Sequence, residues 1–375
     1  MATLTCGTAS AVELAGCVEE SRIRDDVAFI AKPRPVGSAH WQAVQDQCAE
    51  RLSSLGYTVE RMPYGGGVNV IGTKLGTTRP DELVVVSAHY DHIEELDTQG
   101  RACPGADDNA SGVASLYETA RVLAGRDNAR TLVFACWDEE ERGLLGSRAW
   151  AELAAVADAR VVVGITLETM GYTSHEPESQ QLPDGFALFF ADAVRELRER
   201  QNRGDFIAAI GSASAQATLD DLRELGGLTG AHVIPLPLGQ EFLQAQALAD
   251  LRRSDHAPFW DQGYPALMLT DTANFRNPHY HCLNGFDDVD TLDYPFLADV
   301  TANVVGAVVR ALDDLERVAA APNAPACSPQ AQDCPGGQQC SLRANDVSVW
   351  SPVCRDPLGD VGPLETCERP TGEPG

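Results

Sequence analysis

The sequence predicts a mixed, largely parallel α/β sheet flanked by helices on both faces, followed by a small disulfide-rich C-terminal module. Short, unbroken apolar runs predict strands that are covered on both sides. Stretches with helical periodicity lie between these runs, an order typical of α/β proteins. Beyond them, a stretch rich in alanine and proline precedes a segment with many cysteines, which indicates a linker and a separate module.

The elements are expected in the following order. "AVQDQCAERLSSLGYTVE" predicts a helix that ends at Gly56, and its apolar side consists of Val44, Cys48, Leu52 and Leu55. "SGVASLYETARVLAG" predicts a second helix, which ends at Gly125. A final helix is expected from about Phe296 to Ala319. The predicted strands are Leu83–His89, Thr131–Trp137, Val161–Glu168 and Pro265–Asp271.

These elements predict a large domain over residues 1–319, a linker over 320–326 and a cysteine-rich tail module over 327–375. The tail cysteines contain no C-x-x-C pair of the kind that binds zinc, so we expect disulfides among them. Because their number is odd, one must pair elsewhere, stay free or have lost its partner. The tail is a candidate for binding an unknown surface or partner. Its cysteines are Cys327, Cys334, Cys340, Cys354 and Cys367.

Composition narrows the function classes. The net charge of -27 and the pI near 4.5 argue against non-specific binding to nucleic acid or to an anionic membrane surface. No apolar run approaches the roughly 20 residues of a membrane-spanning helix. The 11 cysteines indicate an oxidising compartment, so we expect a secreted or periplasmic protein, and we expect a monomer. Residues 1–17 lack the features of a signal peptide, so we expect a mature or recloned form.

Acidic and imidazole side chains follow the predicted strands at the points where the strands end. In open α/β sheets, ligands bind beyond the carboxyl ends of the strands, so these side chains should meet at one edge. A glycine-rich turn, "CPGADDNASG", adds two aspartates between the first two strands. The side chains concerned are His89 and Asp91, Asp107 and Asp108, the acidic run Asp138–Glu141, Glu168, and His279 and His281.

Such a cluster of acids needs a compensating positive charge, because the carboxylates repel one another and are partly desolvated. Lys32 and Lys74 are the only lysines of the chain. A divalent metal would supply the charge, mixed imidazole and carboxylate ligands suit zinc, and two ions would use the cluster more completely than one. Simpler interpretations remain for the separate motifs: structural histidines, a capped turn in "GADDNASG", and an ion pair between Glu168 and Arg160.

The motifs "SAHYDHI", "PGADDNASGVA", "WDEEERGLLGS", "LETMGY", "SDHAPF" and "YHCLNGFDDVDTLD", in that order, resemble the co-catalytic di-zinc exopeptidase family. This family includes secreted bacterial aminopeptidases and glutamate carboxypeptidase relatives. The resemblance covers residues 20–315 but not the tail. It implies a zinc exopeptidase-like fold, two Zn²⁺ ions as cofactors, and peptide substrates that are hydrolysed by an attacking water.

The resemblance also implies a ligand set. Asp108, which directly precedes Asn109, would bridge the two ions. His89 and Glu168 would complete one site, while Glu141 and His281 would complete the other. Many family members carry aspartate at the position of Glu168, so the longer side chain requires a small shift.

Three further residues receive roles. In the family pattern the paired glutamates precede x-G-L-x-G-S, which selects Glu140 as general base beside the ligand Glu141. Neighbouring residues in a turn point in different directions, so the two carboxylates can serve different purposes. Asp91 is placed to orient the His89 imidazole. Tyr280 would help to stabilise the oxyanion.

The remaining chemistry-bearing residues have ordinary expectations. Asp107 would be a surface residue, and His256 would support the site or lie beside the substrate. A disulfide between Cys103 and Cys282 would brace the site, whereas Cys136 in its buried strand would be a free thiol. The histidines expected at ordinary surface or core positions are His40, His92, His175 and His232.

Competing functions are weighed against these motifs. Ser254, Asp255 and His256 are adjacent, but a catalytic triad is assembled from separated positions, and neither a G-x-S-x-G nor an H-E-x-x-H motif occurs. A glutaminyl cyclase-like single-zinc acyltransferase, a carboxypeptidase and a non-catalytic binding module are alternatives on the same fold. We expect a secreted di-zinc aminopeptidase whose specificity pocket is shaped by the segment Tyr172–Arg253.

Overall fold

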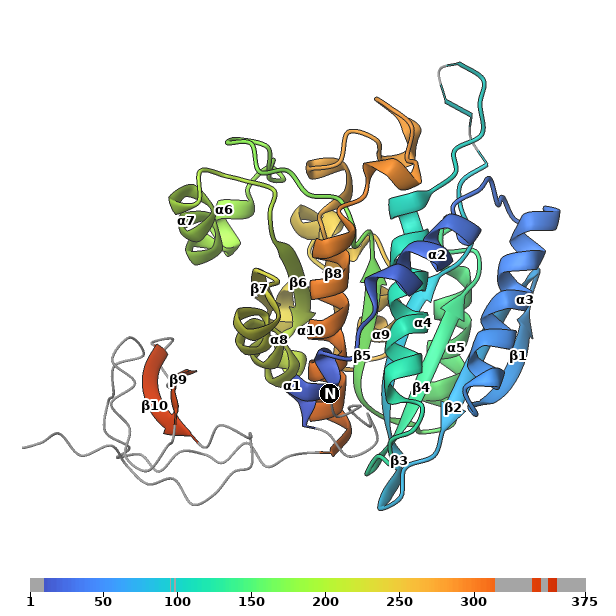
Figure 1. The fold of residues 1–375 in the computed structure, drawn as a ribbon, viewed down its shortest axis with the longest axis horizontal. Helices are drawn as coiled ribbons and strands as arrows, with labels where there is room; N and C mark the ends of the chain where they lie inside the picture. Colours follow the sequence, from blue (N-terminus) through green and yellow to red (C-terminus); the bar gives the residue numbers. More distant parts are fainter. Residues whose placement is uncertain (1–9, 95, 98, 314–338, 345–349, 356–375) are drawn as a thin grey trace, which may run out of the picture. The chain divides into compact units, whose positions relative to one another are not determined.

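The computed structural model describes residues 10–94, 96–97, 99–313, 339–344 and 350–355. The chain divides into two compact units, Met1–Asp313 and Asp314–Gly375. The first unit contains an eight-stranded sheet with the strand order β1-β2-β4-β3-β5-β8-β6-β7 (Figure 1). Its strands are β1 Thr58–Tyr64, β2 Gly67–Lys74, β3 Arg79–His89, β4 Arg130–Trp137, β5 Arg160–Glu168, β6 Ile207–Ser212, β7 Val233–Leu238 and β8 Ala266–Thr270.

The centre of this sheet is parallel. Strands β4, β3, β5 and β8 run in one direction, while β2 pairs with β4 and β6 pairs with β8 in the antiparallel sense. The mixed, largely parallel α/β fold and its four predicted strands are therefore confirmed. The sequence did not predict β1, β2, β6 and β7, and two of these, β1 and β7, contain prolines that argue against a strand.

Helices cover both faces of the sheet, as predicted (Figure 1). Successive side chains of β3 enter opposite cores, because strand side chains alternate: Val84 and Val86 lie in one core and Val85 in the other. Helices α2, α3, α4, α8 and α10 contribute to the first core, and α5, α6, α7 and α9 to the second. The helices are α1 Ala11–Ala15, α2 Glu20–Ile30, α3 Ala39–Ser54, α4 Gly112–Leu123, α5 Leu145–Val156, α6 Phe186–Phe189, α7 Ala191–Glu199, α8 Gln216–Thr229, α9 His256–Asp261 and α10 Tyr294–Asp313.

Helix α10 corrects one expectation from the sequence. Within the described residues it is the one helix that is long and apolar enough to cross a membrane, by length and composition alone. However, 67% of that stretch is buried inside the protein, which is the position of a core helix. The alanines and glycine among its valines hid this stretch when only continuous apolar runs were considered. The predicted end of the helix at Ala319 lies outside the described residues.

Two disulfides whose cysteines both lie in the described part of the chain tie distant segments of the first unit together. Cys103 and Cys282 are bonded, with Cα atoms 5.8 Å apart, as the sequence had suggested. Cys136 is not a free thiol, because it is bonded to Cys48 of α3, with Cα atoms 6.8 Å apart. The reason is geometric: Cys136 lies on the face of β4 that α3 covers, and Cys48 belongs to the apolar side of that helix.

The second unit is described only for an antiparallel hairpin, β9 Gln339–Ala344 with β10 Trp350–Arg355. The predicted linker over 320–326 and most of the tail module lie outside the described residues. The domain boundaries and the disulfides of the tail stay predictions.

Candidate metal centre and active site

The sheet brings the predicted residues to one edge. β3 ends at His89, β5 ends at Glu168, and the turn after β4 carries Glu140 and Glu141. Asp108 lies in the helical turn Ala106–Ser111, and His281 lies in the turn Tyr280–Cys282, which the disulfide at Cys282 holds to Cys103. Because the central strands are parallel, their carboxyl ends meet at this edge.

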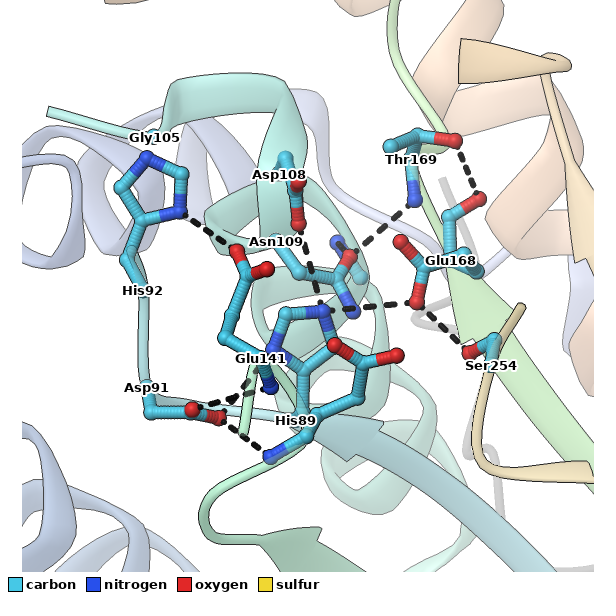
Figure 2. A network of polar contacts seen from close by, with 12 residues as sticks. His89, Asp91, His92, Gly105, Asp108, Asn109, Glu141, Glu168, Thr169 and Ser254 are labelled. Carbon is cyan, nitrogen blue, oxygen red and sulfur yellow. Dashed lines mark hydrogen bonds and ion pairs between the residues drawn. The ribbon is translucent and has the colours of Figure 1, made fainter. Parts of the chain in front are cut away.

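Two donor sets share Asp108. His89 Nε2 lies 3.2 Å from Asp108 Oδ1 and 3.3 Å from Glu168 Oε2. On the other side, His281 Nε2 lies 3.0 Å from Asp108 Oδ2 and 3.4 Å from Glu141 Oε2. Each oxygen of Asp108 therefore faces a different imidazole, which is the arrangement of a bridging carboxylate. We call His89, Asp108, Glu141, Glu168 and His281 the metal-site cluster. Figure 2 labels the first four of these residues.

These contacts fit a metal better than they fit hydrogen bonds. His89 Nε2, Asp108 Oδ1 and His281 Nε2 are buried and, among the described residues, none has an aligned hydrogen-bond partner. Ligand atoms around a tetrahedral zinc with bonds of about 2.0–2.1 Å lie about 3.3 Å apart. The observed separations match that spacing, so the donor atoms converge on shared points. The residues present are therefore suited to holding zinc.

The charged side chains of the metal-site cluster shift one another's pKa values. Burial would raise the pKa of the Asp108 carboxyl, but His281 and His89 hold it well below its ordinary value. Burial would likewise lower the pKa of His281, yet Asp108 and Glu141 raise it to about 10. Asp108 is thus held as a carboxylate, the form that binds metal.

The turn after β4 explains how adjacent glutamates point to different places. Asp91 is buried and accepts the backbone N–H groups of Glu140, at 3.1 Å, and Glu141, at 3.2 Å. It also lies 3.4 Å from His89 Nδ1, so one carboxylate holds both the turn and the imidazole. Burial raises the pKa of Glu140 well above its ordinary value, and Glu168 adds to this against the opposing effect of His89. Such a shift suits a group that both accepts and returns a proton near neutral pH.

Tyr280 lies beside the metal-site cluster. Its ring stacks on His281 with centroids 3.9 Å apart, and its hydroxyl accepts a hydrogen bond from Arg253 at 3.3 Å. Burial, followed by the charges of Asp108 and Glu141, raises the pKa of the hydroxyl, so Tyr280 keeps its proton and can donate it in a hydrogen bond.

Several supporting residues were not predicted. Arg34 is fully buried and donates hydrogen bonds to the carbonyls of Tyr90, Pro104, Gly105 and Asp108. Its guanidinium cation therefore lies against the backbone of the turn that carries Asp108. Asp287 accepts the backbone N–H groups of Asp107 and Asp108. These partners lie far away along the chain. Asp287 belongs to the motif "YHCLNGFDDVDTLD", but its contact with the turn could not be read from that motif.

Asp107 is not a surface residue, as the sequence had suggested, but is fully buried. Its carboxylate accepts hydrogen bonds from Asn277 at 2.7 Å and from the backbone N–H of Gly171 at 2.9 Å. These donors compensate its burial and hold the turn that carries Asp108.

The structure also removes simpler interpretations of the motifs. Arg160 pairs with Glu82 at 2.9 Å rather than with Glu168. Ser254 donates to Glu168 Oε2 at 2.7 Å, and His256 Nε2 lies 2.8 Å from the carbonyl of Leu251, so these two residues form no catalytic triad. His279 packs against Tyr172, with ring centroids 6.0 Å apart.

His92 was expected at an ordinary position, but it lies at the metal-site cluster. Its Nδ1 is 3.1 Å from Glu141 Oε1, and the residue is buried (Figure 2). The donor atoms of His92, Asp108 and Glu141 lie within 4.8 Å of one another. Its place in "SAHYDHI", just after His89 and Asp91, was the only available signal.

An apolar pocket opens beside Glu168 and Tyr280. Its walls come from β6, β7, β8, α6 and α7, and most of its residues belong to the predicted segment Tyr172–Arg253. Polar groups, including Gln180, Asp250 and Arg253, are a minority among its lining residues. The apolar lining consists of Leu182, Pro183, Phe186, Ala193, Leu197, Phe206, Ala208, Ile210, Ile234, Leu236, Leu251, Met268, Ala273 and Phe275.

Residues 69–308 match the family model of peptidase family M28. Among curated relatives, the uncharacterized protein YfbL of Escherichia coli is 32% identical over 60% of this chain and 65% of its own length. A probable zinc metalloprotease of Pyricularia oryzae is 28% identical over 62% of this chain and 47% of its own length. The chain thus spans about half to two thirds of the length of these relatives.

Solved structures share the fold at low sequence identity. The LapA aminopeptidase of Legionella pneumophila has a TM-score of 0.59 at 16% identity, over 82% of this chain and 73% of that chain. A glutaminyl cyclase of Porphyromonas gingivalis has a TM-score of 0.54 at 20% identity, over 78% of this chain and 98% of that chain. At these identities the likeness concerns the fold alone.

Proposed function

The chain belongs to peptidase family M28, and from that premise we propose that it is an aminopeptidase that uses two zinc ions. The observation that carries this proposal is the pair of donor sets on the two oxygens of Asp108. His89, Asp108 and Glu168 would hold one ion, and Asp108, Glu141 and His281 the other. When bound, zinc supplies a Lewis acid and lowers the pKa of the attacking water.

The side chains then have defined tasks. Glu140 takes the proton of the attacking water and returns it to the leaving amine, and its raised pKa supports both steps. Tyr280 keeps its proton and donates a hydrogen bond to the oxygen of the scissile carbonyl as charge develops there. The hydrogen bond from Arg253 holds the tyrosine hydroxyl in place.

The surroundings favour an aminopeptidase over a carboxypeptidase. The carboxylates of the cluster offer a negative site for a free α-amino group. The apolar pocket opens beside Glu168, so the side chain of the first substrate residue can enter it. Its lining indicates a preference for bulky apolar side chains, which bury the most surface there.

Glu140→Gln tests the assignment of the base. The amide fits the same space but accepts no proton, so we expect kcat for leucine p-nitroanilide to fall by about 10²–10⁴-fold. Zinc content should stay at two ions per chain. Glu139→Gln, one residue earlier, is the matched control and should retain activity. Unchanged activity of Glu140→Gln would show that another group is the base.

Peptides with free and with blocked N-termini, assayed with and without a chelator, test the function as a whole. An aminopeptidase releases the first residue of free peptides only, and the chelator stops it. Release of C-terminal residues from blocked peptides would indicate a carboxypeptidase. Cyclisation of N-terminal glutamine with one zinc per chain would indicate a cyclase, and inertness with no zinc would indicate a binding module.

We also propose that the enzyme works outside the reducing cytosol. The disulfides Cys48–Cys136 and Cys103–Cys282 support this, because such bonds persist mainly in oxidising compartments. Fractionation of the native host would test the proposal, and an intracellular, fully reduced protein would contradict it.

A further inference from the structure

His92, in the loop after β3, is buried in a space that the absence of a side chain at Gly105 leaves open. The residue is 1% exposed, and its ring lies against Gly105. A Cβ atom at Gly105 would lie 2.7 Å from His92 Cδ2, so a side chain there would collide with the imidazole. Gly105 also has φ +62°, which glycine adopts readily. The backbone therefore leaves room for this ring at this place.

The contact of His92 with Glu141 indicates which nitrogen of its imidazole carries a hydrogen. Nδ1 lies 3.1 Å from Glu141 Oε1 (Figure 2). A carboxylate that binds metal carries no proton and can only accept, so Nδ1 must be the donor. The other oxygen of Glu141, Oε2, lies 3.4 Å from His281 Nε2, within the metal-site cluster. The two oxygens of Glu141 thus have separate partners.

Glu168, on the other side of Asp108, also has a protein donor. Ser254 donates at 2.7 Å to Glu168 Oε2, the same oxygen that lies 3.3 Å from His89 Nε2. Each terminal carboxylate therefore has one protein donor, but only in Glu141 does the donor contact the oxygen that does not face the imidazole of its donor set. Each donor set already contains one imidazole facing an oxygen of Asp108, His89 in one and His281 in the other.

We propose that His92 is a positioning residue, which donates from Nδ1 to Glu141 Oε1 and so turns Oε2 toward the zinc site shared with His281. This inference rests on the proposed two-zinc site. Without the donor, the Glu141 carboxylate can rotate, and one of the two zinc ions should bind more weakly. The alternative is that His92 itself ligates zinc, since its donor atoms lie within reach of Asp108 and Glu141.

Zinc affinity separates these cases without reference to activity. The variants are His92→Leu, which lacks a donor, and His92→Asn, whose amide nitrogen replaces Nδ1 at the same distance from the backbone. Competition with a chromophoric chelator measures both dissociation constants. We expect His92→Leu to raise the dissociation constant of one zinc ion by about 10–100-fold, which is the usual effect of losing such a partner. The dissociation constant of the other ion should not change. His92→Asn should remain close to the parent.

The outcomes are unambiguous. If His92→Leu binds both zinc ions as tightly as the parent, the proposal is wrong. If His92→Asn and His92→Leu lose zinc affinity to the same extent, the proposal is also wrong, and His92 ligates zinc directly. If His92→Leu does not fold, His92→Gln, whose amide reaches the position of Nε2, takes its place against His92→Asn. His232→Leu is the matched control. His232 Nε2 lies 3.1 Å from Glu196 Oε1, and neither residue belongs to the metal-site cluster. A parent protein that binds fewer than two zinc ions contradicts the proposed function itself.

Discussion

The metal-site cluster and the apolar pocket share a border at Glu168 and Tyr280, but they are built by different forces. The cluster consists of charged side chains, each held by a directed contact such as that of Asp91 with the turn after β4. The pocket is lined by apolar side chains without directional partners. Directed networks tolerate little change, whereas apolar walls tolerate substitutions of similar volume. Reaction chemistry and substrate preference should therefore be separable by mutation.

The largest effect is expected at Asp108. Asp108→Asn removes the charge that both donor sets share, so both zinc ions should be lost or greatly weakened. The value of kcat/KM should fall by more than about 10⁴-fold, beyond the contribution of a single general base. Zinc analysis and kinetics with leucine p-nitroanilide measure this, and thermal melting verifies the fold. A folded variant that retains two tightly bound ions would contradict the bridging role.

Removing each disulfide in turn should separate effects on stability from effects on the geometry of the metal-site cluster. Cys103→Ser/Cys282→Ser should lower the free energy of unfolding by about 2–5 kcal/mol and also reduce zinc affinity, because the bond lies next to His281. Cys48→Ser/Cys136→Ser should lower stability in a similar way but leave zinc affinity unchanged. Chemical denaturation and chelator competition measure the two quantities. Equal zinc affinity in both double variants would show that Cys103–Cys282 does not brace the cluster.

His256, which is fully buried in α9, predicts a pH dependence of stability. Burial lowers its pKa to about 4 from an ordinary value of 6.5. The unfolded chain therefore binds the proton more readily, and stability is lost as pH falls from about 6.5 towards about 4, by at most about 3 kcal/mol. His256→Gln keeps a donor for the Leu251 carbonyl but does not titrate. Urea unfolding of metal-free protein at pH 7 and 4.5 should show a smaller difference for the variant, and identical differences would refute the assignment.

The smallest effect concerns the pocket. Ala193→Phe on α7 places a ring in the pocket, so the preference for leucine over alanine p-nitroanilide should fall by about 10–200-fold, while zinc content stays the same. Ala191→Phe, on the exposed side of the same helix, is the control and should not change the preference. Equal effects of the two variants would show that the pocket does not receive the substrate side chain.

Much of the fold and of the cluster was predictable because it depends on local patterns. The apolar runs of β3, β4, β5 and β8 marked the central strands, and the polar residues that end them marked the site edge. The edge strands β1 and β7 escaped prediction because they contain prolines, which argue against a strand. Asp107 was misjudged, since its burial depends on donors from Asn277 and Gly171 that lie far along the chain.

The sequence by itself therefore determined the α/β order and the ends of the central strands, since these follow from periodicity within short segments. The resemblance to the di-zinc exopeptidases selected the residues of the metal-site cluster among the polar side chains at those ends. Only the tertiary structure decided that His92 contacts Glu141, that Cys48 is bonded to Cys136, and that Arg34 stands behind Asp108. It also decided which apolar side chains line the pocket. These pairings depend on distances between segments that are remote in the chain, and local composition carries no information about such distances.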